Sequence, residues 1–217
     1  MNRETDREIL KQRNAIRFIE AAQELIGTIG LKDISVRKIA EKAGFHNSTI
    51  YLYFEDLDQL ILLASLKHFN DYSKALALQS QKQSSPIEVF RSIWAAFAQA
   101  VFAKPEIFYN FFFGKHSDNL TQIFEQYYRL FPSEKGVFTR EIQDMYFGKN
   151  ISDRCYRILT PLLDEDTRLT SENISIVNEI IVSYLKYLLE EQCQNKDEGV
   201  DARISRLLTA ISYLIGI

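Results

Sequence analysis

Apolar residues recur at helical spacing along most of the chain, with no run of strictly alternating apolar and polar positions. We expect residues 1–8, which are polar, to lie outside the first helix. Predicted helices cover residues 9–26, a short segment between Ser35 and Gly44, and residues 49–54, 56–79, 86–103, a segment from 105, 117–131, 134–147, 152–163, 171–194 and 200–215. Only four prolines and eight glycines occur, which together with this pattern predicts an all-α fold.

The two short helices around Gly44 organise the N-terminal part of the chain. Ser35 is a favourable N-cap, and Gly44 suits the left-handed conformation that often follows a helix. Residues 45–48 form a short connection, after which Ile50 and Phe54 share one face of the next helix. Helix, tight turn and helix in this order are typical of a helix-turn-helix DNA-binding motif.

Polar and phenolic side chains cover the second helix of this motif, where a surface helix usually carries Lys and Glu. A helix-turn-helix places the first residues of its second helix against base edges, while cations on the preceding helix reach phosphates or guanine edges. The predicted DNA-binding residues are Ser35, Arg37, His46, Asn47, Ser48, Thr49, Tyr51 and Tyr53. The alternative is a plain helical hairpin with an incidental polar face.

The same stretch resembles the N-terminal DNA-binding domain of the tetracycline-repressor (TetR) family over about residues 9–66. The resemblance rests on the spacing of Ile39, Ala40, Ala43, Gly44, Phe45, Ser48, Thr49, Ile50, Tyr51, Tyr53 and Phe54. It implies that Arg37, Asn47, Thr49, Tyr51 and Tyr53 occupy positions that touch DNA.

Two positions depart from the family pattern. His46 stands where the family commonly has a serine that caps the recognition helix, and we expect Asn47 to take over the cap. Leu57 stands where a lysine often opens the next helix and holds a phosphate, so one phosphate contact is expected to be missing.

The remainder of the chain reads as a helical body that begins with a capped helix. Asp56 with Gln59, and Ser85 with Glu88, have the spacing of capping boxes. The densest aromatic stretch is residues 107–114. Together with other aromatic residues it predicts an apolar ligand pocket, lined by Trp94, Phe97, Phe108, Phe112 and Tyr128. The alternative is that these rings form ordinary core.

The last two predicted helices carry broad apolar faces, one with Ile181 and the other with Leu208. A two-fold dimer would present two helix-turn-helix motifs to two half-sites of DNA, so we expect these helices to form the interface of a homodimer. The TetR resemblance implies the same, since the corresponding helices of that family form a four-helix dimer interface. The alternative is ordinary core packing.

Charge and cysteine content refine this picture. Residues 1–54 contain nine Lys and Arg against seven Asp and Glu, whereas residues 55–217 contain 17 against 22, which fits a DNA-facing head on an acidic body. Cys155 and Cys193 are far apart in the sequence, so neither a disulfide framework nor a metal site is predicted. The longest apolar run, residues 95–103, is too short to span a membrane, and we expect a cytoplasmic protein.

The sequence therefore predicts a DNA-binding domain in residues 1–54 and a helical ligand-binding and dimerisation domain in residues 55–217. The function favoured is a ligand-responsive, sequence-specific transcriptional repressor that binds double-stranded operator DNA and an apolar or amphipathic small molecule. An enzyme is disfavoured, because the three histidines are scattered and no phosphate loop, metal motif or nucleophile elbow occurs. No cofactor is predicted. The alternatives are a helical interaction module or a helical enzyme without a role in DNA binding.

Overall fold

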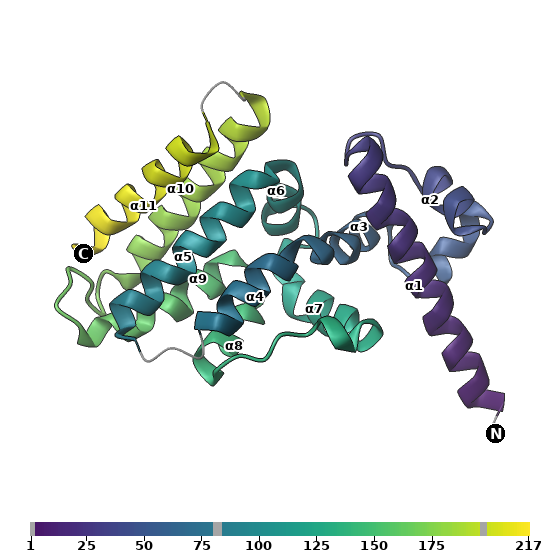
Figure 1. Cartoon of the computed structure of the whole chain (residues 1–217), viewed down its shortest axis with the longest axis horizontal. Coiled ribbons are helices and arrows are strands. Elements are labelled where there is room, and N and C mark those ends of the chain that lie inside the picture. Colours follow the sequence, from purple (N-terminus) through teal and green to yellow (C-terminus); the bar gives the residue numbers. More distant parts are fainter. Residues whose placement is uncertain (1–2, 80–83, 196–198) are drawn as a thin grey trace. The chain divides into compact units, whose positions relative to one another are not determined.

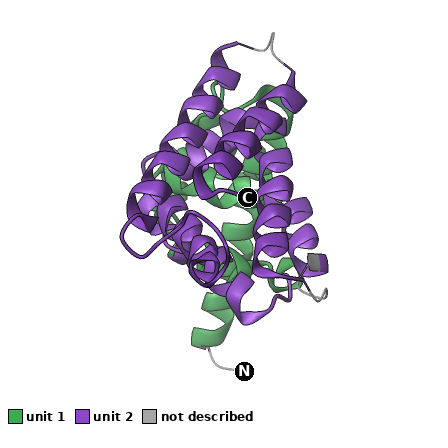
Figure 2. Ribbon diagram, turned by 90° about the vertical axis from the view of Figure 1, so that its left-hand side faces the viewer, with its two compact units in different colours: residues 1–67, 122–135 green, residues 68–121, 136–217 purple. Residues whose placement is uncertain are grey.

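The computed structural model describes residues 3–79, 84–195 and 199–217, and every regular element among them is a helix. The all-α prediction is thus confirmed. The chain forms two compact units (Figures 1 and 2): unit 1 comprises residues 1–67 and 122–135, and unit 2 comprises residues 68–121 and 136–217. The division into functional domains at residues 1–54 and 55–217 stays a prediction, because packing alone does not tell which residues bind DNA or a ligand.

Unit 1 is built on a long helix against which two short helices pack. Its elements are α1 (Arg3–Ile29), α2 (Val36–Ala43), the 3₁₀ helix η1 (Asn47–Leu52), α3 (Leu57–Ser65), most of α7 (Leu120–Leu130) and the 3₁₀ helix η4 (Pro132–Glu134). Both α2 and α3 contact α1. The apolar residues buried between them are Phe18, Ile19, Ala22, Ile26, Ile39, Ala40, Ile50, Phe54, Leu60 and Leu63.

The first helix is longer than predicted at its N-terminal end. It begins at Arg3, so the expectation that residues 1–8 lie outside it is wrong for residues 3–8, while residues 1–2 are outside the described residues. Residues 1–8 are polar, and this composition wrongly indicates a segment outside the helix. Glu4 and Asp6 lie in the first turn, where negative charge interacts favourably with the helix dipole.

The helix α7 follows unit 2 residues in the sequence, yet most of it packs within unit 1. Tyr127 is fully buried there, and its hydroxyl donates to Glu134 Oε2 at 2.7 Å. The Nε2 atom of Gln23 on α1 lies 3.5 Å from the same hydroxyl. Residues of α7, which are distant in sequence from α1, therefore pack against α1 within unit 1.

The single helix predicted for residues 56–79 is interrupted in the structure. Asp56 caps α3 by accepting from Gln59 N at 2.8 Å, as predicted, but a 3₁₀ turn, η2 (Leu66–Phe69), separates α3 from α4 (Asn70–Gln79). The hydroxyl of buried Ser65 donates to Ile61 O at 2.7 Å, a bond that often bends a helix. Unit 1 passes into unit 2 within this turn.

Unit 2 holds the remaining helices. They are α4, α5 (Pro86–Ala103), α6 (Pro105–Phe113), η3 (Ser117–Asn119), α8 (Arg140–Tyr146), α9 (Ile151–Leu159), η5 (Thr160–Asp164), α10 (Ile174–Gln194) and α11 (Val200–Ile215). The predicted capping box of α5 is confirmed, with Ser85 Oγ accepting from Glu88 N and the Glu88 carboxylate accepting from Ser85 N. The helix predicted for residues 134–147 is shorter, because residue 134 ends the 3₁₀ helix η4 and residues 135–139 form no regular element before α8 begins at Arg140.

The two C-terminal helices, α10 and α11, lie side by side (Figure 1). The predicted dimer face on α10 is wrong, because Ile174, Val177, Ile181, Leu185 and Leu188 are buried within unit 2 itself. Apolar side chains on another face of α10 are exposed instead: Ile176, Ile180 and Tyr187. No described helix is long and apolar enough to cross a membrane.

Candidate nucleic-acid interface and ligand cavity

The first helix of the helix-turn-helix ends as its caps predict. Ser35 Oγ accepts a hydrogen bond from Lys38 N at 3.3 Å at the start of α2. Gly44 adopts φ of 75° at its end, and its N–H is bonded to carbonyls of the last turn. A non-glycine residue there would be strained, since the left-handed region disfavours a side chain.

Arg17 and Phe18 on α1 fix the turn in place. The Arg17 guanidinium donates to Ala43 O at 2.7 Å and lies 4.6 Å from the ring centre of Phe45. Phe18 is fully buried and stacks on Phe45, with ring centres 4.8 Å apart. A carbonyl bond, a cation–π contact and a ring stack thus hold the turn against the long helix.

The second helix of the motif is a 3₁₀ helix, η1, rather than the predicted α-helix over residues 49–54. His46 is its N-cap: the Nδ1 atom lies 3.4 Å from Ser48 N as acceptor and 2.9 Å from Ser48 Oγ. The expectation that Asn47 takes over the cap is therefore wrong. An imidazole nitrogen replaces the usual cap oxygen as acceptor, and the Asn47 side chain is left exposed.

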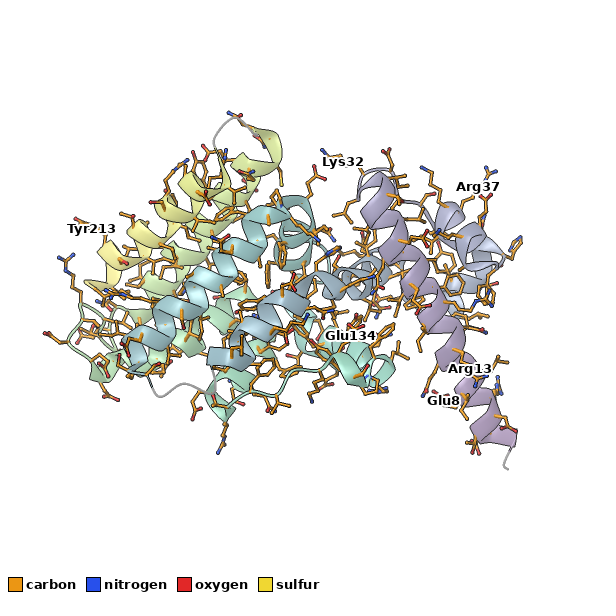
Figure 3. All side chains as sticks on the ribbon, in the orientation of Figure 1. Glu8, Arg13, Lys32, Arg37, Glu134 and Tyr213 are labelled. Carbon is orange, nitrogen blue, oxygen red and sulfur yellow. The ribbon has the colours of Figure 1, made fainter. Side chains whose placement is uncertain are left out.

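The predicted DNA-binding residues lie on consecutive elements of unit 1 and differ in exposure. Arg37, His46, Asn47, Ser48 and Tyr51 are exposed, whereas Ser35, Thr49 and Tyr53 are half-buried. Figure 3 shows Arg37 on α2. Ile50 and Phe54 point into the core, as predicted. The exposed set combines a cation, an amide, a hydroxyl, an imidazole and a phenol, which are groups that proteins use on phosphates and base edges.

Two residues of this surface were missed by the sequence interpretation. Leu52 on η1 is 70% exposed, although it is apolar. Asn14 on α1 donates from Nδ2 to the Tyr53 hydroxyl at 2.9 Å, which orients the phenol and leaves its O–H as a donor. The exposure of Leu52 followed from the register of Ile50 and Phe54, but the pairing of Asn14 with Tyr53 depends on tertiary packing.

The predicted pocket residues are all buried and fall into both units. Trp94, Phe97, Phe108 and Phe112 belong to unit 2, whereas Tyr128 belongs to unit 1, where it stacks on Phe124 with ring centres 6.2 Å apart. Phe112 lies among the rings of Phe69, Phe97, Phe108 and Phe111, at centre distances of 5.2 to 6.2 Å. These rings form a tightly packed aromatic core. Their part in ligand binding stays a prediction.

A cavity of about 270 Å³ lies beside this core in unit 2, among α5, α8, α9 and η5. We call it the outer cavity. Its lining is mostly apolar and comprises Ser84, Pro86, Val89, Phe90, Ile93, Thr139, Glu141, Ile142, Arg157, Ile158 and Pro161. The Arg157 side chain is bonded to Asp153 Oδ2 at 3.0 Å. A cavity of this size and composition suits a small, largely apolar molecule.

A second, smaller cavity of about 20 Å³ adjoins it and shares Ile93 and Ile158 as lining residues. We call it the inner cavity. The rest of its lining comprises Tyr72, Trp94, Phe97, Met145, Ile151, Arg154 and Cys155. Sequence interpretation identified Trp94 and Phe97 but not Tyr72 and Arg154, which lie on different helices and carry no motif.

Burial and charge tune the polar groups of the inner cavity. Burial raises the pKa of Tyr72 to about 12, although the neighbouring Arg154 guanidinium acts in the opposite direction. The phenol therefore stays protonated at neutral pH. Burial also raises the pKa of the Cys155 thiol, which keeps it in the unreactive protonated form.

In the described part of the chain, no three His, Cys, Asp or Glu side chains lie close enough together to hold a metal ion.

Comparison with known proteins gives one family match, and it lies within unit 1. Residues 18–64 match the family model described as bacterial regulatory proteins, tetR family. Curated protein sequences give no significant match.

Similar solved structures span nearly the whole chain. RolR in complex with resorcinol has 18% sequence identity and a TM-score of 0.64, covering 97% of this chain and 91% of that one. FadR from Thermus thermophilus, a TetR-family repressor in complex with lauroyl-CoA, has 14% identity and a TM-score of 0.59, covering 91% and 92%. A TetR regulator from Rhodococcus sp. RHA1 has 15% identity and a TM-score of 0.56, covering 94% and 96%.

Proposed function

We propose that the protein is a TetR-like transcriptional regulator, and specifically a repressor whose binding to operator DNA is changed by a small apolar or amphipathic molecule. The observation that carries the proposal is the helix-turn-helix of unit 1, whose α2 and η1 display Arg37, Asn47 and Tyr51 in exposed positions on a fixed turn. Its site of action would be the cytoplasm, where bacterial operator DNA lies.

In the proposed complex, η1 enters the major groove and α2 crosses the backbone. Asn47 suits an adenine edge, which presents both a donor and an acceptor to an amide. Arg37, Tyr51 and the Tyr53 hydroxyl suit phosphates, and exposed Leu52 suits the methyl group of a thymine. Phosphate contacts would position the motif, and Asn47 and Leu52 would supply sequence preference.

Substitution of Asn47 and Tyr51 tests this division of roles. We expect Asn47→Ala to cost about 1 to 3 kcal/mol on the preferred site, selected from fragments of its own genomic DNA, and little on random duplex. Tyr51→Phe should weaken binding to both duplexes alike, because a phosphate contact carries no base information. Titrations of both variants on both duplexes give the comparison. Equal losses on the two duplexes for Asn47→Ala would remove Asn47 from base recognition.

We propose that the working form is a homodimer that pairs the exposed faces of α10 and α11. Ile176, Ile180 and Tyr187 on α10 and Tyr213 on α11 are large apolar side chains at the surface, and Figure 3 shows Tyr213 at its position on α11. Tyr184 and Tyr187 stack with ring centres 6.1 Å apart and extend the same face of α10. A two-fold axis through this surface would bury it and present two helix-turn-helix motifs to two half-sites.

Adjacent residues of α10 provide a matched test of this interface. Ile180→Glu with Tyr187→Glu should give a folded monomer with weak operator binding, because both side chains are exposed in the single chain. Ile181→Glu should unfold unit 2 instead, since Ile181 is buried within it. Sedimentation and melting temperature separate the two results. A dimer that persists in the double variant at low concentration would place the interface elsewhere.

We propose that the small molecule binds in unit 2, where Trp94 and Phe97 line the inner cavity and the outer cavity adjoins it. That RolR binds resorcinol and that FadR binds lauroyl-CoA are properties of those proteins, and they support a ligand-binding body on this fold. A ligand shifts the protein between states only as far as its affinities for them differ.

The single tryptophan, Trp94, reports on this site. Ligands that change operator binding should change its emission and raise the melting temperature of the protein. If an effector changes operator binding and leaves both signals unaltered, the ligand site lies elsewhere.

A further inference from the structure

The inner cavity of unit 2 is lined by hydrogen-bond donors and apolar groups. Its polar lining residues are Tyr72, Trp94, Arg154 and Cys155, and its lining contains no Asp or Glu. The Trp94 indole Nε1 is buried and has no hydrogen-bond partner among the described residues. Because a buried donor without an acceptor costs free energy, this cavity is suited to a ligand that accepts hydrogen bonds.

Arg154 gives the inner cavity a positive charge in an apolar environment. The residue is only 2% exposed. Its Nη1 donates to Tyr146 O at 2.6 Å, and its guanidinium carbon lies 5.6 Å from the ring centre of Phe112 and 5.3 Å from that of Tyr146. A carbonyl and two aromatic faces hold the guanidinium at the cavity. Attraction to an anion is much stronger in such surroundings than in water.

Tyr72 adds a second polar group beside this charge. Its hydroxyl donates to Met145 Sδ at 3.9 Å, a weak acceptor that a carboxylate would replace, and the nearby Arg154 guanidinium acts to lower the pKa of this phenol, which burial nevertheless keeps protonated. A guanidinium and a phenol side by side form a donor pair, and a planar carboxylate matches a guanidinium with two parallel bonds.

The outer cavity provides space for the rest of such a molecule. It shares Ile93 and Ile158 with the inner cavity, so rotation of these two side chains would join them. The combined volume lies just below the range of about 300 to 1,000 Å³ for small-molecule sites, which limits the ligand to a small one. The lining of the outer cavity is mostly apolar, with Glu141 and Arg157 of opposite charge at exposed positions.

We propose that the effector is a small monocarboxylate with a compact apolar body of one ring or a short chain. Its carboxylate binds Arg154 and Tyr72 in the inner cavity, and its apolar body fills the outer cavity between α5, α8 and α9. This inference rests on the proposed ligand-responsive function and specifies the chemistry of the ligand. A neutral molecule of the same shape would fill the outer cavity but would lack the charge that the Arg154 guanidinium attracts.

Octanoate and octanamide are a matched pair of probes for this inference, because they differ in charge and hardly in shape. We expect octanoate to bind the full-length protein roughly 10- to 100-fold more tightly than octanamide, as read from Trp94 emission and from the melting temperature. Equal affinities for the two probes, or no binding of octanoate, would overturn the inference.

Variants locate the carboxylate. Arg154→Gln should abolish the preference for octanoate over octanamide, whereas Arg91→Gln, which removes an exposed charge from α5, should retain it. Tyr72→Phe keeps the ring and should reduce the preference about 3- to 10-fold, which provides a test if Arg154→Gln does not fold. A preference that is lost in Arg157→Gln and kept in Arg154→Gln would place the carboxylate at the cavity mouth and overturn the assignment.

Operator binding is measured separately with the same preparations. If the protein binds operator DNA and releases it with another effector but does not bind octanoate, the carboxylate inference is wrong and the proposed regulatory function stands. If the protein binds octanoate at Arg154 but binds no DNA duplex at low salt, the carboxylate site stands and the proposed regulatory function is wrong.

Discussion

Aromatic and charged side chains are used in opposite ways in the two units. In unit 1, Tyr51 is 58% exposed on η1, and Arg37 is exposed on α2. In unit 2, Phe112 is 2% exposed among other rings, and Arg154 is as deeply buried beside it. The exposed ring and cation of unit 1 therefore keep their hydration, whereas the buried ring and cation of unit 2 have been removed from water.

This difference indicates what each unit recognises. An exposed cation keeps its hydration and attracts phosphates at long range, with an affinity that falls with salt. A buried cation has lost its hydration and needs fixed partners, such as Tyr146 O at 2.6 Å from Arg154. The first arrangement suits a large polyanion such as DNA, and the second suits a small ligand that is enclosed. The two are separable by mutation.

The largest effect is expected for Phe112→Ala in unit 2. Removal of a buried ring that contacts four others should destabilise the protein by about 3 to 5 kcal/mol, because the packed neighbours cannot fill the cavity. Tyr51→Ala is the matched change in unit 1, and it should alter stability by less than about 0.5 kcal/mol while weakening DNA binding. Urea unfolding of both variants gives the comparison. Similar losses of stability would mean that Tyr51 is a packing residue.

Two glycines of unit 1 provide the next contrast. Gly44 has a φ of 75°, and a Cβ there would lie 3.1 Å from Arg17 Nη2, so Gly44→Ala should destabilise the motif by about 1 to 2 kcal/mol. Gly27 lies within α1 in open space, where an added Cβ would meet no neighbouring atom, so Gly27→Ala should stabilise by about 0.5 to 1 kcal/mol. Thermal unfolding measures both. Destabilisation by Gly27→Ala would show that its exposed surface is needed for another contact.

Local rules account for the parts of this molecule that the sequence predicted well. Ser35, Gly44, Asp56 and Ser85 all occupy the cap positions expected of them, since a cap depends on a few neighbouring residues. The burial of Ile50 and Phe54 followed from spacing in the same way.

Tertiary packing accounts for the parts that the sequence did not predict. Membership of most of α7 in unit 1 depends on contacts between segments distant in sequence, such as Gln23 with Tyr127. The apolar stripe of α10 with Ile181 is core, because unit 2 covers it, whereas the stripe with Ile180 is exposed. Periodicity identifies both stripes without telling which is covered. The approach of Tyr72 to Arg154 has no signature in sequence at all.

A smaller effect is expected for Asn14→Ala. The Asn14 side chain donates to the Tyr53 hydroxyl at 2.9 Å. Loss of this hydrogen bond should lower both the free energy of unfolding and the DNA affinity, each by about 0.5 to 1.5 kcal/mol. Tyr53→Phe should reproduce the loss of affinity, because it removes the same hydroxyl. A double variant that is no worse than either single one would show that the two side chains act as a pair. Additive losses would show that Asn14 acts independently of Tyr53.

A small change in stability is expected for Leu57→Lys. Leu57 is the first residue of α3 and is half-buried, so its replacement should cost less than about 1 kcal/mol of apolar burial. A lysine at this position would restore the phosphate contact that the family pattern implies. Binding to every duplex should then tighten, with little change in preference among sequences.

The salt dependence of binding distinguishes a phosphate contact from a packing effect. With Leu57→Lys, the fall of log K with log salt should steepen by about 0.9 for each new contact, or about 1.8 for a dimer. Leu57→Gln is the matched control, because it loses the same apolar burial without gaining charge. A slope that is unchanged in Leu57→Lys, together with an equal fall of melting temperature in both variants, would assign Leu57 to the core of unit 1 and not to the DNA-facing surface.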